Sequence, residues 1–93
     1  MRMIKLKERY RNFFEHGLGA GAQNKDLGLG QTASTAGDHS NATTQMEYKA
    51  FLDGFEIGGK YAAEWREGKD VLRCAIKNGD VLPADFYLEE TQP

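Results

Sequence analysis

The sequence predicts an all-α fold: a small helical domain with one long helix, a helical hairpin and a long flexible loop. Two apolar stripes, one near the N-terminus and one after residue 44, repeat at spacings of three and four residues, the period of a helix face. Between them, residues 22–42 are small and polar, contain no aromatic residue and follow no period. A chain of 93 residues with a single cysteine predicts one domain without an internal disulfide.

The first predicted helix spans residues 1 to about 21. Its apolar stripe consists of Met3, Leu6, Tyr10, Phe13 and Gly17. Gly17, Gly19 and Gly21 stand at alternate positions, and each weakens a helix by about 1 kcal/mol relative to alanine. We therefore expect this helix to end between Gly17 and Ala22.

The segment from Ala22 to Ala42 buries too little apolar surface to offset the entropy lost on ordering, so we expect a loop that is mobile in the free protein. Its stretch from Gly28 to Thr32 ends like a phosphate-binding loop. That motif needs a glycine where Lys25 stands and a lysine where Gln31 stands, so nucleotide hydrolysis is not expected.

The strongest periodic signal follows Thr44, which stands three residues before Glu47, the spacing of a capping box that starts a helix. The helix either ends near Gly68 or continues as one long helix to Asn78. In the first case residues 71–76 form a separate short helix, with Gly79 just past its end. The apolar stripe of the main helix consists of Tyr48, Phe51, Leu52, Phe55, Gly58, Gly59, Ala62 and Trp65.

The C-terminal part has a competing interpretation, because Asn78-Gly79 is the strongest local signal for a β-hairpin. Pro83 would fall early in the second strand and cannot donate a hydrogen bond there, so we favour the helix. Pro83 also suits the first turn of a short helix, which we expect from Pro83 to Leu88.

The aromatic side chains exceed what two helices alone can cover. We predict Phe51, Phe55 and Trp65 at the centre of the core, with Gly58 and Ala62 as the face that allows a close helix approach. Outside the loop, roughly 70 residues make a core of marginal size. We therefore expect a homodimer. Its seam would consist of Phe51, Phe55, Gly58, Gly59 and Ala62.

Two segments, Phe14–Gly21 and Phe51–Gly58, share the pattern F-x-x-G-apolar-x-x-G, which places two glycines four residues apart on one helix face. Either the match is a coincidence in a glycine-rich chain or two helices cross closely at these glycines. Within them, Phe14-Glu15-His16-Gly17 and Phe51-Leu52-Asp53-Gly54-Phe55 resemble helix segments of the ribosome modulation factor family. The resemblance implies a helical hairpin, with any RNA contact on the basic N-terminal helix. This chain departs from that strongly basic family in its net charge of -2 and in its long Gly/Ser/Thr loop.

No catalytic or metal-binding constellation stands out, so we expect neither an enzyme nor a cofactor. The spacing of the two histidines, His16 and His39, does not bring them together with an acid as metal ligands. Cys74 lies on or beside an apolar stripe, which predicts a buried, inert thiol.

Charge is distributed unevenly along the chain. Residues 1–16 hold five basic and two acidic residues, and residues 70–93 hold two basic and five acidic ones. The two ends therefore attract each other, within one chain or between two. The first helix carries a basic side, and we predict partner binding there, through Arg2, Lys5, Arg9, Tyr10 and His16.

These features predict a non-enzymatic interaction protein that binds and occludes a surface of a larger macromolecule, such as a phage or mobile-element inhibitor of a host defence complex. A protein is the expected partner. The alternatives are a ribosome- or RNA-associated factor that uses the basic helix and an oligomeric binder of a small phosphorylated ligand. No apolar run reaches the roughly 18 residues that cross a bilayer, so we expect a cytoplasmic protein without membrane contact.

Overall fold

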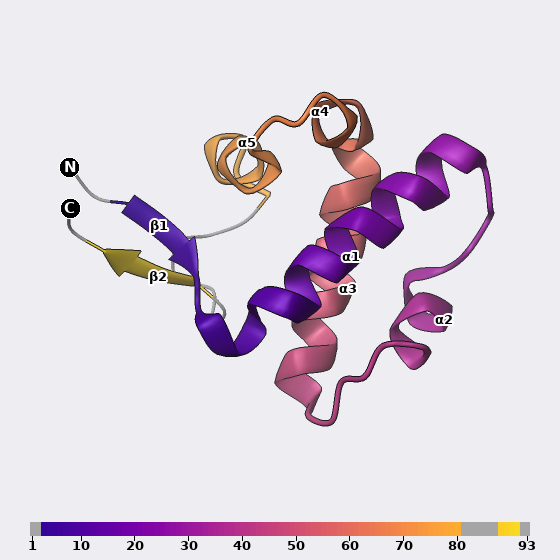
Figure 1. The fold of residues 1–93 in the computed structure, drawn as a ribbon, viewed down its shortest axis with the longest axis horizontal. Coiled ribbons are helices and arrows are strands. Elements are labelled where there is room, and N and C mark those ends of the chain that lie inside the picture. The colour runs from indigo at the N-terminus through magenta and orange to yellow at the C-terminus, as the bar shows by residue number, and fades with distance from the viewer. Residues whose placement is uncertain (1–2, 81–87, 92–93) are drawn as a thin grey trace.

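The structure is a computed structural model that describes residues 3–80 and 88–91. As predicted, the fold is mostly helical: in the described residues two long helices cross, with three short helices and a two-stranded sheet around them (Figure 1). In chain order the elements are β1 (Met3–Leu6), α1 (Glu8–Leu27), α2 (Ala33–Asp38), α3 (Gln45–Lys60), α4 (Ala62–Arg66), α5 (Val71–Lys77) and β2 (Leu88–Thr91).

The two ends of the chain pair as an antiparallel sheet, in which Lys5 lies opposite Glu89 and Leu6 lies opposite Leu88. The predicted helix is therefore wrong over residues 3–6. The complementary charges meet within one chain, where Lys5 Nζ lies 3.5 Å from Glu89 Oε1. Pairing with β2 satisfies the backbone groups of β1, and a distant partner of this kind leaves no trace in the local period.

Helix α1 continues through Gly17, Gly19 and Gly21 to Leu27, well beyond its predicted end. It stops at Gly28, whose left-handed backbone (φ 61°) lets its N–H bond to the carbonyl oxygen of Asn24. Local propensity predicted an earlier end because it takes no account of packing. Gly17 and Gly21 lie against the backbone of α3, and this packing offsets their low helix propensity.

The glycines of the repeated pattern form the crossing between α1 and α3, which confirms the close-crossing interpretation. Each of four glycines lies so near the other helix that a Cβ atom would collide with a backbone carbonyl oxygen there. The contacts advance in the same direction along both helices, so α1 and α3 run the same way across each other. The pairs are Gly17 with Phe51, Gly21 with Phe55, Gly54 with Phe14, and Gly58 with Leu18.

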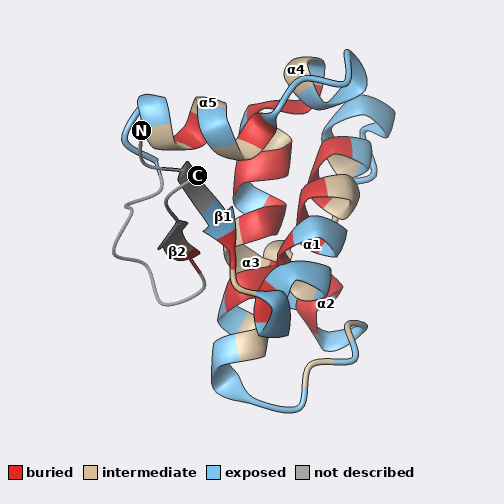
Figure 2. Cartoon of the chain, turned by 60° about the vertical axis from the view of Figure 1, so that its left-hand side comes forward, coloured by how far each residue is buried: buried red, intermediate tan, exposed pale blue. Residues whose placement is uncertain are grey.

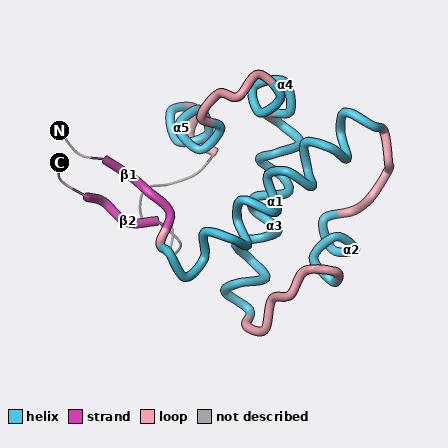
Figure 3. The backbone as a smooth tube through the Cα atoms, in the orientation of Figure 1, coloured by secondary structure: helices cyan, strands magenta, loops and turns pink. Residues whose placement is uncertain are grey.

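Because helices that run the same way cannot be joined by a short turn, residues 28–44 return along the crossing, and α2 lies in this return (Figure 3). The prediction of an irregular loop over residues 22–42 is thus wrong for residues 22–27, which belong to α1, and for Ala33–Asp38. The polar residues of the segment act as caps. Thr32 Oγ1 accepts a hydrogen bond from the N–H of Thr35 at 3.1 Å and starts α2.

Two apolar clusters flank the crossing, and the buried faces of α1 and α3 are visible in Figure 2. Phe14 is the largest fully enclosed side chain of the described residues. The sheet-side cluster consists of Leu6, Tyr10, Phe14, Leu18, Ala50, Ile57, Tyr61, Val71, Ala75 and Leu88. The α2-side cluster consists of Ala36, Phe51 and Phe55, with Phe13, Ala20, Ala33 and Leu52 packed against it.

The predicted start of α3 is confirmed: Thr44 Oγ1 accepts from the N–H of Glu47, and Glu47 Oε1 accepts from the N–H of Thr44, at 3.1 Å each. Helix α3 ends at Lys60, and α4 follows after Tyr61, which leaves the helical backbone region (φ -111°, ψ 33°). Gly68 then adopts a left-handed backbone (φ 77°) and separates α4 from the next helix. The alternative of one long helix to Asn78 is therefore wrong.

Helix α5 confirms the short-helix interpretation of residues 71–76 over the hairpin. The side chain of Asp70 caps its start by accepting from the N–H of Arg73, and Gly79 just past its end has a left-handed backbone (φ 80°). The short helix predicted from Pro83 lies outside the described residues, except for Leu88, which belongs to β2.

Phe51 and Phe55 are buried as predicted, but Trp65 is not central: it lies on α4 and is 37% exposed. Most of the predicted dimer seam packs within the chain: the backbone of α1 lies against Phe51, Phe55 and Gly58, and Ala62 is buried. Gly59 is half-buried, and a homodimer with a seam of Phe51, Phe55, Gly58, Gly59 and Ala62 stays a prediction.

Candidate functional site

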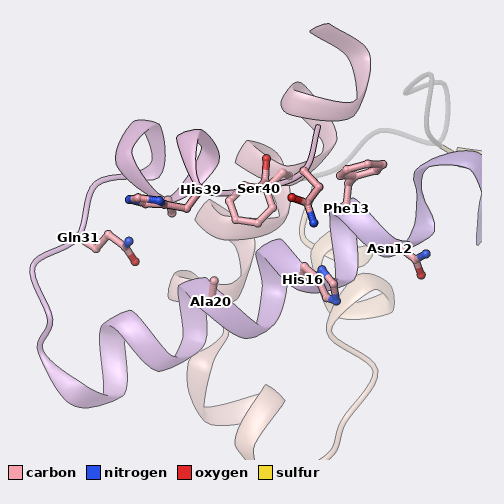
Figure 4. Close-up of a pocket in the computed structure, with 10 residues that line it drawn as sticks. Asn12, Phe13, His16, Ala20, Gln31, His39 and Ser40 are labelled. Carbon is pink, nitrogen blue, oxygen red and sulfur yellow. The ribbon is translucent and has the colours of Figure 1, made fainter. Parts of the chain in front are cut away.

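A pocket of about 500 Å³ opens between α1, α2 and α3, beside the α2-side cluster (Figure 4). Its floor is apolar and buried, and consists of Ala36 from α2 and Phe51 from α3. Phe13 and Ala20, both half-buried, form the wall on α1. The pocket therefore exists because α2 covers the α2-side cluster incompletely.

The rim of the pocket is polar. Helix α1 contributes Asn12 and His16, which are exposed and share the face of Phe13 and Ala20 through spacings of three and four residues. The connections on either side of α2 complete the rim with Gln31, His39, Ser40 and Asn41. Figure 4 shows Gln31 and His39 toward one end of the pocket and Asn12 toward the other.

Two local hydrogen-bond systems hold the rim in place. The side chain of Asn24 donates to the carbonyl oxygen of Gln31 at 2.9 Å and accepts from its N–H at 2.8 Å. At the other end of α2, Ser40 Oγ donates to the carbonyl oxygen of Gly37 at 2.6 Å. These bonds fix the connections before and after α2, so the rim side chains project from a defined backbone.

Helix α2 is seated on α3 through a glycine. A Cβ atom at Gly37 would lie 2.7 Å from the ring of Tyr48, so a larger residue there would require the ring to shift. The hydroxyl of Tyr48 lies 3.3 Å from the carbonyl oxygen of Ser34 and 3.4 Å from Asp38 Oδ1, as a donor. The carboxylate of Asp38 is thereby engaged with α3.

The chemistry of the pocket is that of a binding site. Its side chains can accept or donate hydrogen bonds above an apolar floor, and the two imidazole rings do not point toward each other in Figure 4. Among residues 3–80 and 88–91, no three histidine, cysteine, aspartate or glutamate side chains gather as metal ligands would. The pocket thus offers shape and hydrogen bonding to an occupant.

A second polar group ties the end of α3 to the end of α5. Asp80 accepts hydrogen bonds from the Lys60 ammonium at 2.7 Å and from the Tyr61 hydroxyl, which in turn accepts from the Asn78 amide at 3.0 Å. The bond from Lys60, and after it the bond from Tyr61, lowers the pKa of Asp80. The bond to Asp80 raises the pKa of both Tyr61 and Lys60. These groups act as a clasp between the two helices.

The predicted partner-binding residues do not share one surface. Lys5 lies in β1 and pairs with Glu89, and Tyr10 is buried, with its hydroxyl 3.4 Å from Met46 Sδ. Arg2 lies outside the described residues. Arg9 and His16 are exposed on α1, and His16 lies on the pocket rim.

Of the pocket residues, sequence reasoning assigned only His16 to partner binding, and it missed above all His39 and Gln31. They belong to the segment predicted as a mobile loop, and their place depends on α2 docking against Tyr48. The available signal was the cap spacing of Thr32 and Thr35, which marks a helix start inside the polar segment. Cys74 is half-buried against the sheet-side cluster, away from the pocket lining.

Among the described residues, no helix combines the length and apolar character needed to span a membrane. Neither a protein-family model, nor a curated protein, nor a solved structure matches the chain, so the resemblance to the ribosome modulation factor family stays a prediction.

Proposed function

We propose that the protein is a non-enzymatic binding protein that recognises another protein through the pocket and covers part of that partner's surface. The observation that carries this proposal is the pocket itself, with its buried floor of Phe51 and Ala36 beneath a rim of amides, imidazoles and a hydroxyl. Pockets of about 300–1,000 Å³ with an apolar lining and a few placed polar groups are typical binding sites.

The side-chain amides of the rim favour a peptide segment as the occupant. Asn12, Gln31 and Asn41 each carry one acceptor and one donor group, the same pair that a peptide backbone presents. Apolar side chains of that segment would fill the floor, while its backbone bonds to the rim. A role as an inhibitor of a host defence complex stays a prediction.

The two alternative functions have less support. The basic side predicted for an RNA contact is divided, because Lys5 is in β1 and pairs with Glu89. The glycine-rich stretch predicted to close over a phosphorylated ligand serves to end α1 at Gly28 and to start α2 at Thr32. RNA binding that weakens steeply with salt would favour the RNA alternative.

Blocking the pocket tests the proposal. Ala20→Trp places a large side chain on the half-buried wall, whereas Ala63→Trp places the same side chain on the exposed surface of α4. We expect proteins captured from the native cells by the wild type and by Ala63→Trp to be lost with Ala20→Trp. If Ala20→Trp keeps its helical circular dichroism and still captures the same proteins, the pocket is not the recognition site.

A further inference from the structure

We propose that the occupant of the pocket is a short extended segment that presents an aliphatic side chain to the floor and carboxylates to the α1 side of the rim. This inference rests on the proposed function and specifies the chemistry of the partner. It follows from an internal two-fold relation between α1 and α3, because the two sides of the crossing are equivalent but covered differently.

The relation is an offset of 37 residues between the two halves of the crossing. Gly17 contacts Phe51, and its counterpart Gly54 contacts Phe14, the counterpart of Phe51. One helical turn later, Gly21 contacts Phe55, and its counterpart Gly58 contacts Leu18, the counterpart of Phe55. When residue i meets residue j and their counterparts meet in reverse, the two elements are related by a two-fold axis.

The same offset exchanges the central part of the two apolar clusters. In the sheet-side cluster α1 supplies Tyr10, Phe14 and Leu18, and α3 supplies Ala50 and Ile57. Tyr10 has a polar counterpart, Glu47, but adding or subtracting 37 converts the other four residues into members of the α2-side cluster. The resulting set is Phe51, Phe55, Phe13 and Ala20. At these four positions, the two clusters are equivalent sites on the same pair of helices.

The two sites have different covers. A short helix, α2, follows α1, whereas two short helices, α4 and α5, follow α3, and Figure 1 shows α2 and α5 on opposite sides of the crossing. The sheet-side cluster receives in addition Leu6 and Leu88, which face each other across the antiparallel pair. No strand covers the α2-side cluster among the described residues, and the pocket lies there. The filled site thus shows which kind of segment fits the open one: an extended strand that inserts a leucine.

Charge complementarity specifies the flanking residues. Arg9 lies one helical turn before Phe13, on the face of α1 that carries His16 and Ala20 to the pocket. Arg9 is exposed and lies outside the pocket lining, with its guanidinium 6.0 Å from the centre of the Tyr10 ring. The α2 side carries a carboxylate, Asp38, which accepts a hydrogen bond from the Tyr48 hydroxyl. The cation beside the pocket is thus on α1, and the carboxylates of an incoming strand belong on that side, as Glu89 of β2 meets Lys5 on the filled side.

The probes can be copied from the strand that fills the equivalent site. Strand β2 has the sequence Leu-Glu-Glu-Thr. We would titrate the isotope-labelled full chain with a capped peptide of this sequence, with Leu-Lys-Lys-Thr, which reverses the charge, and with Ala-Glu-Glu-Thr, which removes the aliphatic side chain. Amide chemical shifts report both the affinity and the place of binding.

The acidic leucine peptide should shift the amide signals of pocket residues such as Phe13, His16 and Ala36. The alanine peptide should bind at least about tenfold more weakly, because it no longer buries the leucine side chain. The lysine peptide should bind about two- to fivefold more weakly for each exposed ion pair that it loses. Arg9→Gln should weaken binding of the acidic peptide about two- to fivefold, as for an exposed ion pair, and leave the lysine peptide unchanged.

Three results would overturn the inference: equal binding of all three peptides, no binding by any of them, or shifts confined to β1, which would mean that the peptide replaces β2. The capture experiment separates this failure from failure of the proposed function. If capture depends on Ala20 but the acidic leucine peptide does not bind the pocket, the function stands and the partner chemistry is wrong.

Discussion

At the scale of single residues, neighbouring glycines of α3 have different roles. A Cβ atom at Gly58 would collide with the backbone of Leu18, whereas a Cβ at Gly59 would lie 3.7 Å from the nearest atom, an ordinary contact. Both residues are glycines of the same helix and have the same helix propensity, so packing is what distinguishes them.

Alanine at these two positions should therefore change stability in opposite directions. Gly58→Ala should lower the free energy of unfolding by about 1–3 kcal/mol, because the crossing must open to admit the methyl group. Gly59→Ala should raise it by up to about 1 kcal/mol, since alanine is the better helix former and meets no obstacle. Urea denaturation of both variants measures the difference. A stabilised Gly58→Ala variant would show that the helices are not in close contact there.

The start of α3 depends on a cap made by two side chains. Thr44→Ala removes the acceptor for the N–H of Glu47, so the free energy of unfolding should fall by about 1 kcal/mol. Thr44→Ser keeps a hydroxyl and should lose far less. Chemical denaturation of the two variants checks this, and equal losses would assign the effect to the methyl group of threonine.

At the scale of elements, the clasp of Lys60, Tyr61, Asn78 and Asp80 fixes α5 on α3 and should make stability depend on pH. The pKa of Asp80 is lowered in the folded chain, so its contribution is complete above the unfolded pKa and is lost progressively as pH falls below about 4. The pKa of Tyr61 is raised, so its contribution is lost as pH rises through about 10 and above.

Asp80→Asn should abolish the first dependence and weaken the second, because asparagine does not titrate and carries no negative charge that disfavours ionised Tyr61. Denaturation curves at a series of pH values, compared between the wild type and Asp80→Asn, measure this. Asp70→Asn is the matched control, since Asp70 caps the other end of α5. A wild-type stability that falls in parallel with that of Asp80→Asn below pH 4 would contradict the role of the clasp.

Elements with local causes could be predicted from the sequence, and elements with distant causes could not. The start of α3 is encoded by Thr44 and Glu47, three residues apart, and the end of α5 by Gly79. Strand β1 exists because β2 lies beside it at the other end of the chain. Helix α1 likewise continues through its glycines because it packs on α3, and local helix propensity carries no information about that packing.

The pocket illustrates the same limit at the level of the site. His16 was predicted as part of a binding face, and it lies on the rim. His39 was assigned to a loop without a role, because nothing in its neighbourhood shows that Gly37 seats α2 on Tyr48. The tertiary contact, rather than the local sequence, brings the two sides of the rim together.

At the scale of the whole molecule, the two-fold relation predicts unequal effects of equivalent substitutions. Phe14 is fully enclosed, whereas Phe51 borders the pocket. Phe14→Ala should cost about 3–5 kcal/mol, because an empty cavity is added to the lost transfer energy. Phe51→Ala should cost only about 1.5–3 kcal/mol, since it enlarges a space that is already open.

Thermal and urea unfolding of the two variants provide the comparison. Phe55→Ala, which is in the α2-side cluster but does not line the pocket, should resemble Phe14→Ala. Equal losses for Phe14→Ala and Phe51→Ala would mean that the pocket is closed in solution and that the two clusters are equally filled.

The crossing of α1 and α3 also determines the order in which the chain can acquire structure as it is synthesised. Helix α1 emerges first, but its three glycines together cost about 3 kcal/mol of helix propensity, and an isolated helix of this length is marginal even without them. The carbonyl oxygens that contact Gly17 and Gly21 belong to Phe51 and Phe55, 34 residues further along the chain. The N-terminal half of the growing polypeptide therefore stays unfolded until the segment from Phe51 to Gly58 has been synthesised. Both halves then fold as one cooperative unit.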